Sequence, residues 1–346
     1  MTAGFVDRLA LELRSAAERE AGRTRRARSR TLALGGAALL AALALIAVLV
    51  LRPAAHPVRA PLHAVDRVRL TGNPGAITAA YGSVWVPDNV AGVVLRVDPR
   101  TRALQARIRI GSGQPFRIAA GAGALWLPEH DGTGVMRIDP RGNELTHHRL
   151  HTPDGAPFFV ADLAAGGGSV WAVGPGGALR VDPVTGEGAR LAGVAEADWA
   201  AMAGDTFWFL TTDGRLYALD PASGLPRSVA PTRVGGADPI LGDPSGVTAA
   251  AAATLVRVAA DGKVAWRRRL GLRVNELARQ GKSLWVHVSE RRGPDRLVEL
   301  DAATGRERSS LALATFGATG LAAVGDELWL DTPVGDTLIL GRQRTP

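Results

Sequence analysis

The sequence predicts an all-β fold, a seven-bladed β-propeller with six blades as the alternative, preceded by one transmembrane helix and a short cytoplasmic amphipathic helix. Three observations support this prediction. A tryptophan that follows a glycine-rich turn recurs about every 40 residues. A run of twenty apolar residues without charge lies near the N-terminus. The 42 glycines and 21 prolines among 346 residues indicate many turns and few long helices.

Residues 1–31 form the predicted cytoplasmic segment, with eight arginines, four acidic residues and a charge of +4. Phe5, Leu9 and Leu13 recur at helical spacing between charged residues, which predicts a short amphipathic helix. This helix either orients the membrane anchor or docks a cytoplasmic protein partner.

Residues 32–51 read LALGGAALLAALALIAVLVL and hold no charge. A helix of this length spans about 30 Å, the thickness of the hydrocarbon core of a bilayer. Five arginines precede the run between Arg23 and Arg30, and only Arg52 and Arg59 follow closely. The positive-inside rule therefore predicts a single-pass protein of the cell membrane, with its N-terminus cytoplasmic and its propeller extracytoplasmic. The alternative is a cleaved signal peptide, although the apolar region of such a peptide is usually shorter, about 7–15 residues.

The proline-containing stretch 52–64 is predicted to be an extended linker, and 65–346 to be the propeller domain. Residues 52–69 carry a charge of +3, so only +1 of the net charge of +8 belongs to residues 70–346. A nucleic-acid partner would require a basic face on the domain, and none is predicted. The absence of cysteine excludes disulfides, thiolate metal sites and a cysteine nucleophile.

Six tryptophans mark the repeat with spacings of 41, 45, 37, 77 and 44 residues: Trp85, Trp126, Trp171, Trp208, Trp285 and Trp329. The gap of 77 residues holds two units, the second of which lacks its tryptophan and has Val247 near the equivalent position. Seven units of about 40 residues match the size of a four-stranded blade.

Each unit contains the same succession of predicted strands. An inner strand of small residues such as DLAAG is followed by the tryptophan strand, then by a third strand that ends in aspartate, as in LRVDP, and by a fourth. Blades crowd near the axis, so the inner strand carries alanine and glycine, and the tryptophan fills the wider gap further out. Neighbouring blades cover both faces of each sheet, which makes the strands continuously apolar. The aspartate is expected to cap backbone N–H groups of the turn.

The last unit has too few residues for a fourth strand after residues 337–340, and a spare strand at 65–70 stands before the first unit. We expect this N-terminal strand to close the last blade, because an unpaired sheet edge would otherwise remain exposed.

The pattern P-x-x-I-A-A-x-G-x-V-W-V, followed by R-V-D-P-x-T-G, resembles the YVTN and virginiamycin B lyase-like propellers over about residues 65–341. The fourth unit, GDTFWFLTTDGRLYALDPASG, is similar to the PQQ-type repeat. The resemblance implies the propeller fold through turn and packing residues. Propellers of this kind include a lyase, dehydrogenases and non-catalytic binding modules, so the resemblance leaves the function open.

In a propeller, the loops between the second and third strands share one face with the connections between blades, around an axial funnel where ligands usually bind. The candidate ligand-binding residues on this face are Phe116, Arg117, Glu129, His130, Asp131, Phe159, Trp199, Asp238 and Asn275. Their mixture of aromatic, acidic and basic groups suits a polar organic ligand or a peptide. The alternative is that they are solvated loop tips.

We predict neither a metal site nor a cofactor. Glu129, His130 and Asp131 have the right donor atoms for a divalent cation, but adjacent residues rarely direct their side chains to one point. The outer-strand histidines are expected to be exposed edge residues: His147, His148 and His151. The resemblance to the lyase implies a histidine with an acid-bound Mg²⁺, and His287 and Glu290 do not match that pattern closely.

Two functions of different class follow. The first is a ligand- or protein-binding, sensory module on the outer side of the membrane, with a protein partner on either side; a structural envelope subunit is a variant without a small ligand. The second is a propeller lyase or hydrolase that acts on an exported metabolite or glycan. No G-x-S-x-G elbow is present, and we predict no catalytic residues. An enzyme would need two or more titratable groups converging in the funnel.

Overall fold

The computed structural model describes residues 62–69, 72, 74–111, 117–194, 196–219, 225–229, 239–251, 253–289, 293–313, 320–332 and 335–342. The predicted amphipathic helix at 1–31, the predicted transmembrane helix at 32–51 and the linker up to residue 61 lie outside the described residues. Within the described ranges, no helix has the length and hydropathy needed to cross a membrane.

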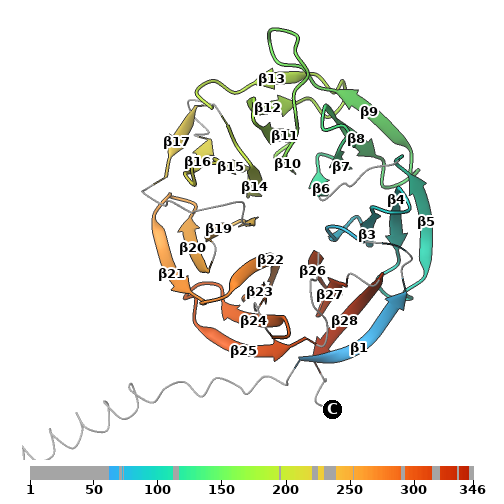
Figure 1. Ribbon diagram of the computed structural model, residues 1–346, viewed down its shortest axis with the longest axis vertical. Coiled ribbons are helices and arrows are strands. Elements are labelled where there is room, and N and C mark those ends of the chain that lie inside the picture. Colours follow the sequence, from blue (N-terminus) through green and yellow to red (C-terminus); the bar gives the residue numbers. More distant parts are fainter. Residues whose placement is uncertain are drawn as a thin grey trace, which may run out of the picture. The chain divides into compact units, whose positions relative to one another are not determined.

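The described strands form seven four-stranded antiparallel sheets arranged in a ring, which confirms the predicted seven blades (Figure 1). The first three blades consist of β2 Thr78–Ala80, β3 Ser83–Asp88, β4 Val93–Val97 and β5 Leu104–Arg109; β6 Ala119–Gly121, β7 Ala124–Pro128, β8 Gly134–Ile138 and β9 Leu145–Arg149; and β10 Asp162–Gly166, β11 Ser169–Gly174, β12 Gly177–Val181 and β13 Gly188–Arg190.

The next three blades consist of β14 Trp199–Ala203, β15 Thr206–Leu210, β16 Leu216–Leu219 and β17 Pro226–Ser228; β18 Ile240–Asp243, β19 Gly246–Ala251, β20 Thr254–Ala259 and β21 Val264–Arg269; and β22 Arg273–Gln280, β23 Ser283–Ser289, β24 Arg296–Asp301 and β25 Glu307–Ala312. The seventh is made of β26 Gly320–Val324, β27 Glu327–Asp331, β28 Asp336–Arg342 and β1 Leu62–Arg69. The first strand of each blade lines the axis and the fourth lies at the rim (Figure 1).

The seventh blade closes the ring with strands from both ends of the described chain. Strand β1 pairs antiparallel with β28, from Leu62 opposite Arg342 to Arg69 opposite Asp336. The strand begins at Leu62, so the predicted linker at 52–64 ends earlier than expected. Leu62 is buried in the apolar cluster between the sixth and seventh blades, which explains why the strand starts there.

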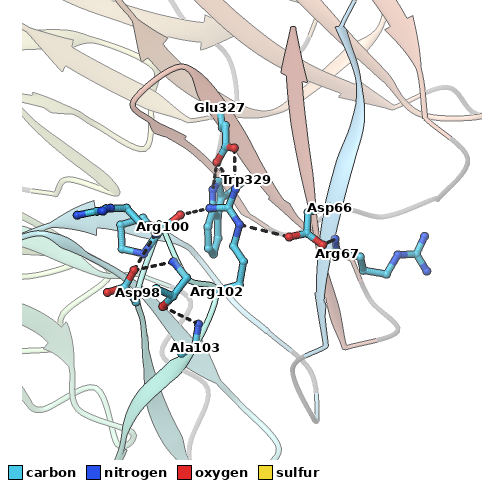
Figure 2. A network of polar contacts seen from close by, with 10 residues as sticks. Asp66, Arg67, Asp98, Arg100, Arg102, Ala103, Glu327 and Trp329 are labelled. Atoms are coloured by element: carbon cyan, nitrogen blue, oxygen red, sulfur yellow. Dashed lines mark hydrogen bonds and ion pairs between the residues drawn. The ribbon is translucent and has the colours of Figure 1, made fainter. Parts of the chain in front are cut away.

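Polar contacts of Arg102 join the first blade to the seventh (Figure 2). The guanidinium donates to Glu327 Oε1 at 2.6 Å, lies 3.4 Å from Asp66 Oδ2 of β1, and stands over the ring of Trp329 at 5.1 Å. Arg102 also donates to the carbonyl of Pro99 in its own turn. One side chain therefore contacts the closing strand and both blades that flank the ring closure.

The repeated tryptophans are buried between the sheets, and several satisfy their indole N–H within their own blade. Trp85 Nε1 donates to the carbonyl of Ala80 at 3.0 Å, and Trp126 Nε1 donates to Gly121 at 3.1 Å. The indole therefore fills the space between blades and ties the second strand to the turn that follows the inner strand.

In the fifth blade, the residue at the tryptophan position differs from Val247, which the sequence placed near it. In the first blade, Trp85 is paired with Thr78 of the inner strand, and this is the third residue pair counted from the turn. In the fifth, the same register position is held by Thr248, opposite Leu241. The residue that replaces tryptophan is therefore Thr248, and Val247 is its neighbour on the other face of the sheet.

The predicted turn chemistry is present where the third strand ends in aspartate. Asp98 Oδ1 accepts the backbone N–H of Arg100 at 2.8 Å and of Thr101 at 2.9 Å, and these bonds hold the pKa of Asp98 below its usual value. The same pair of backbone bonds is made by Asp139, Asp182 and Asp301. A short local motif thus recurs at four of the rim turns in the described chain.

Candidate functional site

Three side chains from successive blades meet where the inner strands begin. Arg117 precedes β6, Asp162 begins β10 and Trp199 begins β14. The Arg117 guanidinium lies over the Trp199 ring, 3.6 Å from its centroid, and its Nε is 3.7 Å from Asp162 Oδ1. Two of the candidate residues, Arg117 and Trp199, are therefore in direct contact, and the acid beside them was not among the candidates.

Asp162 is buried and fully engaged. Its Oδ1 accepts the N–H of Leu163 at 2.8 Å, and its Oδ2 accepts the N–H of Ala200 in the next blade at 3.0 Å. Burial raises its pKa, and Arg117 together with the backbone donors opposes this rise. Asp162 thus links the inner strands of two blades and holds the guanidinium of Arg117 in place.

The inner strand of the sixth blade brings a second carboxyl group towards this cluster. The pairing register of β22 shifts between Val274 and Glu276, and such an irregularity re-aims the side chains around it. Protein surrounds Glu276, although part of its side chain still meets solvent. This burial raises its pKa to about 7; the charge of Arg117 lowers it and that of Asp162 raises it. Glu276 therefore lies within electrostatic reach of both residues.

Asp331, the last residue of β27, adds a third carboxyl group from the seventh blade. It is fully buried; its Oδ1 accepts a hydrogen bond from Thr337, and its Oδ2 has no hydrogen-bond partner among the described residues. Burial, together with the smaller effect of the Glu276 charge, raises its pKa to about 8 in spite of the hydrogen bond from Thr337. Near neutral pH, Glu276 and Asp331 can each bind or release a proton.

We call these five residues the funnel cluster: Arg117, Asp162, Trp199, Glu276 and Asp331. The cluster combines one permanent cation, an aromatic face and three carboxyl groups from five different blades. It offers hydrogen-bond donors, acceptors and exchangeable protons to a ligand.

Glu129, His130 and Asp131 do not converge. Glu129 Oε1 lies 2.7 Å from Nδ1 of His147 on the outer strand, and Asp131 Oδ2 accepts from Arg149 at 2.7 Å. The two carboxylates are thus held by separate partners on β9. Among the described residues no group of three or more His, Asp or Glu side chains has a metal-binding arrangement.

A cavity of about 370 Å³ lies next to Arg117 on the same face. It is lined by Arg117, Pro128, Glu129, His130, Gly132, Val160 and Ala161. Glu129 and His130 thus border a space that adjoins the funnel cluster through Arg117.

The remaining candidates are placed as follows. Phe159 is 55% exposed, near the Gly132 turn, and Asn275 accepts a hydrogen bond from Ser289 at 3.4 Å. Phe116 and Asp238 lie outside the described residues. An exposed aromatic ring near the cavity is a suitable contact for an apolar ligand group.

A histidine–aspartate pair lies beside the cluster in the sixth blade. His287 is fully buried, and its Nε2 is 3.0 Å from Asp295 Oδ2, whereas its buried Nδ1 has no hydrogen-bond partner among the described residues. Burial lowers the pKa of His287 and outweighs the effect of Asp295, which raises it. Glu276 stands directly opposite His287 in the β22–β23 pairing. Glu290, which the sequence analysis compared with the lyase pattern together with His287, lies outside the described residues.

Sequence reasoning missed three acidic members of the cluster: Asp162, Glu276 and Asp331. Asp162 and Glu276 each stand in an inner strand of small or apolar residues, as in DLAAG and VNELARQ, and Asp331 ends the apolar strand ELWLD. An acid in a strand that both neighbours cover is costly unless it has a role, and this was the available signal.

Comparison with known proteins places the fold but not the activity. No protein-family model matches the chain, and no curated protein sequence matches it significantly. Virginiamycin B lyase from Staphylococcus aureus matches with a TM-score of 0.64 and 14% identity, over 82% of this chain and 100% of that one.

Two further solved structures match in the same way. The β-propeller domain of Cps50 (Swd1) from Myceliophteria thermophila has a TM-score of 0.64 and 15% identity, over 82% of this chain and 100% of the other. BamB from Moraxella catarrhalis has a TM-score of 0.56 and 12% identity, over 81% and 100%. At such identities the similarity is one of fold, and the chain is a seven-bladed propeller like virginiamycin B lyase.

Proposed function

We propose that the protein is a single-pass membrane protein whose extracytoplasmic propeller binds a ligand or a protein partner at the funnel face, as a binding or sensory module. The uncharged run at 32–51 and the arginines before it support the membrane anchor and its orientation. The funnel cluster and the adjacent cavity support the binding role.

The observation that carries the proposal is the placement of Arg117 on Trp199 beside the buried Asp162, with the partly exposed Glu276 within electrostatic reach. Burying polar groups costs free energy, and an axis built only for stability would be lined by the alanine and glycine that occupy most inner strands. A cluster of titratable and aromatic groups beside a cavity, which Arg117 borders, is typical of a binding site.

Two experiments on the full-length chain test the proposal. Alkaline phosphatase fused after residue 346 should be active, and fused after residue 31 inactive, because the enzyme folds only outside the cytoplasm. The reverse pattern would contradict the orientation.

For binding, the detergent-solubilised protein is screened against small polar metabolites by thermal shift. We expect hits that Trp199→Ala abolishes and Val184→Thr leaves unchanged, since Val184 is 84% exposed in a rim turn remote from the cluster. Hits that persist in Trp199→Ala would refute a binding funnel. If the screen gives no hits, cross-linking in membranes should capture a protein partner that Trp199→Ala loses, and the absence of such a partner would refute the proposal as well.

A second candidate function, a propeller lyase or hydrolase for an exported metabolite or glycan, is favoured by one specific observation. His287, hydrogen-bonded to Asp295 and opposite Glu276, has the groups needed for proton transfer. A solved relative in fold is a catalytically inactive histidine variant of virginiamycin B lyase with quinupristin. Incubation of quinupristin with the full-length protein and with His287→Ala distinguishes the two: turnover lost in the variant supports a lyase, and no turnover by the parent excludes it for this substrate.

A further inference from the structure

The charges of the funnel cluster are unbalanced. The guanidinium of Arg117 pairs with Asp162, and its charge also acts on Glu276, whereas Asp331 is reached by the charge of Glu276. The charges that act on Glu276 are those of Arg117 and Asp162, and the charge that acts on Asp331 is that of Glu276. The acids thus exceed the cations in this part of the described funnel, and two carboxyl groups remain without a cation of their own.

Trp199 shows what chemistry this face accepts. The Arg117 guanidinium lies 3.6 Å from its ring centroid, within the range of a cation–π interaction, with a carboxylate at its edge. An aromatic face beside an acid is a general arrangement for holding organic cations. In this structure the protein's own Arg117 guanidinium occupies the cation position on the face of Trp199.

Asp331 provides the second and independent observation. Its side chain is fully buried, and its Oδ2 lacks a hydrogen-bond donor among the described residues. An unmatched buried oxygen is unfavourable, and a donor brought by a ligand would offset this cost. Ammonium and guanidinium groups supply several N–H donors together with a positive charge.

We infer that the funnel cluster binds an organic cation, an ammonium or guanidinium group that Glu276 and Asp331 neutralise and that competes with Arg117 for the face of Trp199. This inference rests on the proposed binding function and specifies its ligand. A divalent metal ion is the less favoured occupant, because the described residues include no group of three His, Asp or Glu side chains suited to one. An anionic ligand would meet three carboxyl groups.

A pH dependence follows from the same geometry. The titratable and charged groups around the site are Arg117, Asp162, Glu276 and Asp331, with His287 and Asp295 on the strand and loop behind Glu276. A bound cation stabilises the ionised carboxylates, so binding releases protons. Affinity should therefore rise as the pH is raised from about 6 to about 8.

The test is isothermal titration of the full-length protein with three probes of one shape: benzylammonium, benzyl alcohol and benzoate. We expect saturable binding of benzylammonium alone, with proton release revealed by buffers of different ionisation enthalpy. Glu276→Gln and Asp331→Asn should each weaken binding about tenfold, and Val184→Thr should leave it unchanged.

Arg117→Ala distinguishes a cation from an anion. Removing the internal competitor should strengthen benzylammonium binding several-fold, whereas a site built around Arg117 for anions would lose benzoate binding. If Arg117→Ala does not fold, the Glu276→Gln result decides.

Benzoate binding, or no preference for benzylammonium, would overturn the cation inference. The proposed function would still stand if the metabolite screen yields Trp199-dependent hits of other charge. The proposed binding function itself is refuted if no bound molecule or protein partner depends on Trp199. A Mg²⁺ titration that saturates and displaces benzylammonium would assign the site to a metal instead.

Discussion

The first and fifth blades fill the tryptophan position of the repeat with different side chains. In the first, Trp85 fills the space beside the second strand, and Arg96 of the third strand stacks on it at 5.0 Å while donating to Ser83 at 2.9 Å. In the fifth, Thr248 replaces the tryptophan, and the equivalent Arg257 turns inward.

Arg257 is buried, 2.6 Å from Asp243 Oδ1, and donates to Ser245 and Thr248. Asp243 also accepts from Arg279 of the next blade at 3.2 Å. An aromatic filler and a buried ion pair can thus occupy the same position of one repeat, provided that the partner on the third strand adapts. The difference predicts that the two blades respond to mutation and to pH in different ways.

The largest effect is expected in the first blade. Trp85→Ala should lower the free energy of unfolding by about 3–5 kcal/mol, because it leaves a large cavity and removes the surface on which Arg96 stacks. Urea denaturation followed by circular dichroism measures this. The control is Val184→Ala at an exposed position, and equal midpoints for the two variants would show that the tryptophan is not the filler that holds the blade.

In the fifth blade, Asp243→Asn should cost about 2–3 kcal/mol, because the buried Arg257 loses its charged partner. Burial opposes the ionisation of Asp243, but the bonds from Arg257 and Ser245 outweigh it and lower the pKa. This contribution is therefore complete above the pKa of the unfolded chain and is lost as the pH falls through the folded value.

Asp261→Asn is the matched control for the fifth blade, since Asp261 pairs with Lys263 on the surface. Urea denaturation at pH 7 and at pH 3 should show a smaller difference between Asp243→Asn and the parent in acid. A constant difference at both pH values would contradict an ion pair.

The funnel should show the opposite pH dependence. Asp331 has a folded pKa of about 8, far above that of the unfolded chain, so its stability contribution is fully present in acid and is lost as the pH rises through 8. Asp331→Asn should therefore be more stable than the parent at pH 9 by about 1–2 kcal/mol and equal to it near pH 4. Thermal melts across this range test it, and a variant destabilised at pH 9 would refute a burial-raised pKa.

The smallest effect is expected at the ring closure. Arg102 is partly exposed, so Arg102→Ala should cost only about 1 kcal/mol despite its contacts with Glu327, Asp66 and Trp329. Arg67→Ala, which removes a more exposed pair with Asp336, should cost less still. Limited proteolysis of the β1 strand should be faster in Arg102→Ala only, and equal rates would mean that the β1–β28 ladder alone holds the closure.

The sequence predicted some members of the funnel cluster and missed others. Arg117 and Trp199 were expected at the funnel because they stand where inner strands begin, a position set by the repeat. Glu276 and Asp331 were not, because nothing local in VNELARQ or ELWLD shows that the two strands bring their acids within electrostatic reach. The register shift before Glu276, which re-aims its side chain, also leaves no clear mark in the sequence.

The sequence by itself determined the repeat and the aspartate-capped turns, and it predicted seven blades with six as the alternative, since these depend on periodicity and on hydrogen bonds between residues two or three positions apart. The closing strand, Leu62–Arg69, could be expected from the shortage of residues at the C-terminus. Only the tertiary structure decided that a buried Arg257–Asp243 ion pair accompanies the loss of tryptophan in the fifth blade and that five blades place charged or aromatic groups in one funnel. Arg117 and Glu276, about 160 positions apart in the chain, come within electrostatic reach only after the ring has closed, and the burial that raises the pKa values of Glu276 and Asp331 exists only in the folded ring.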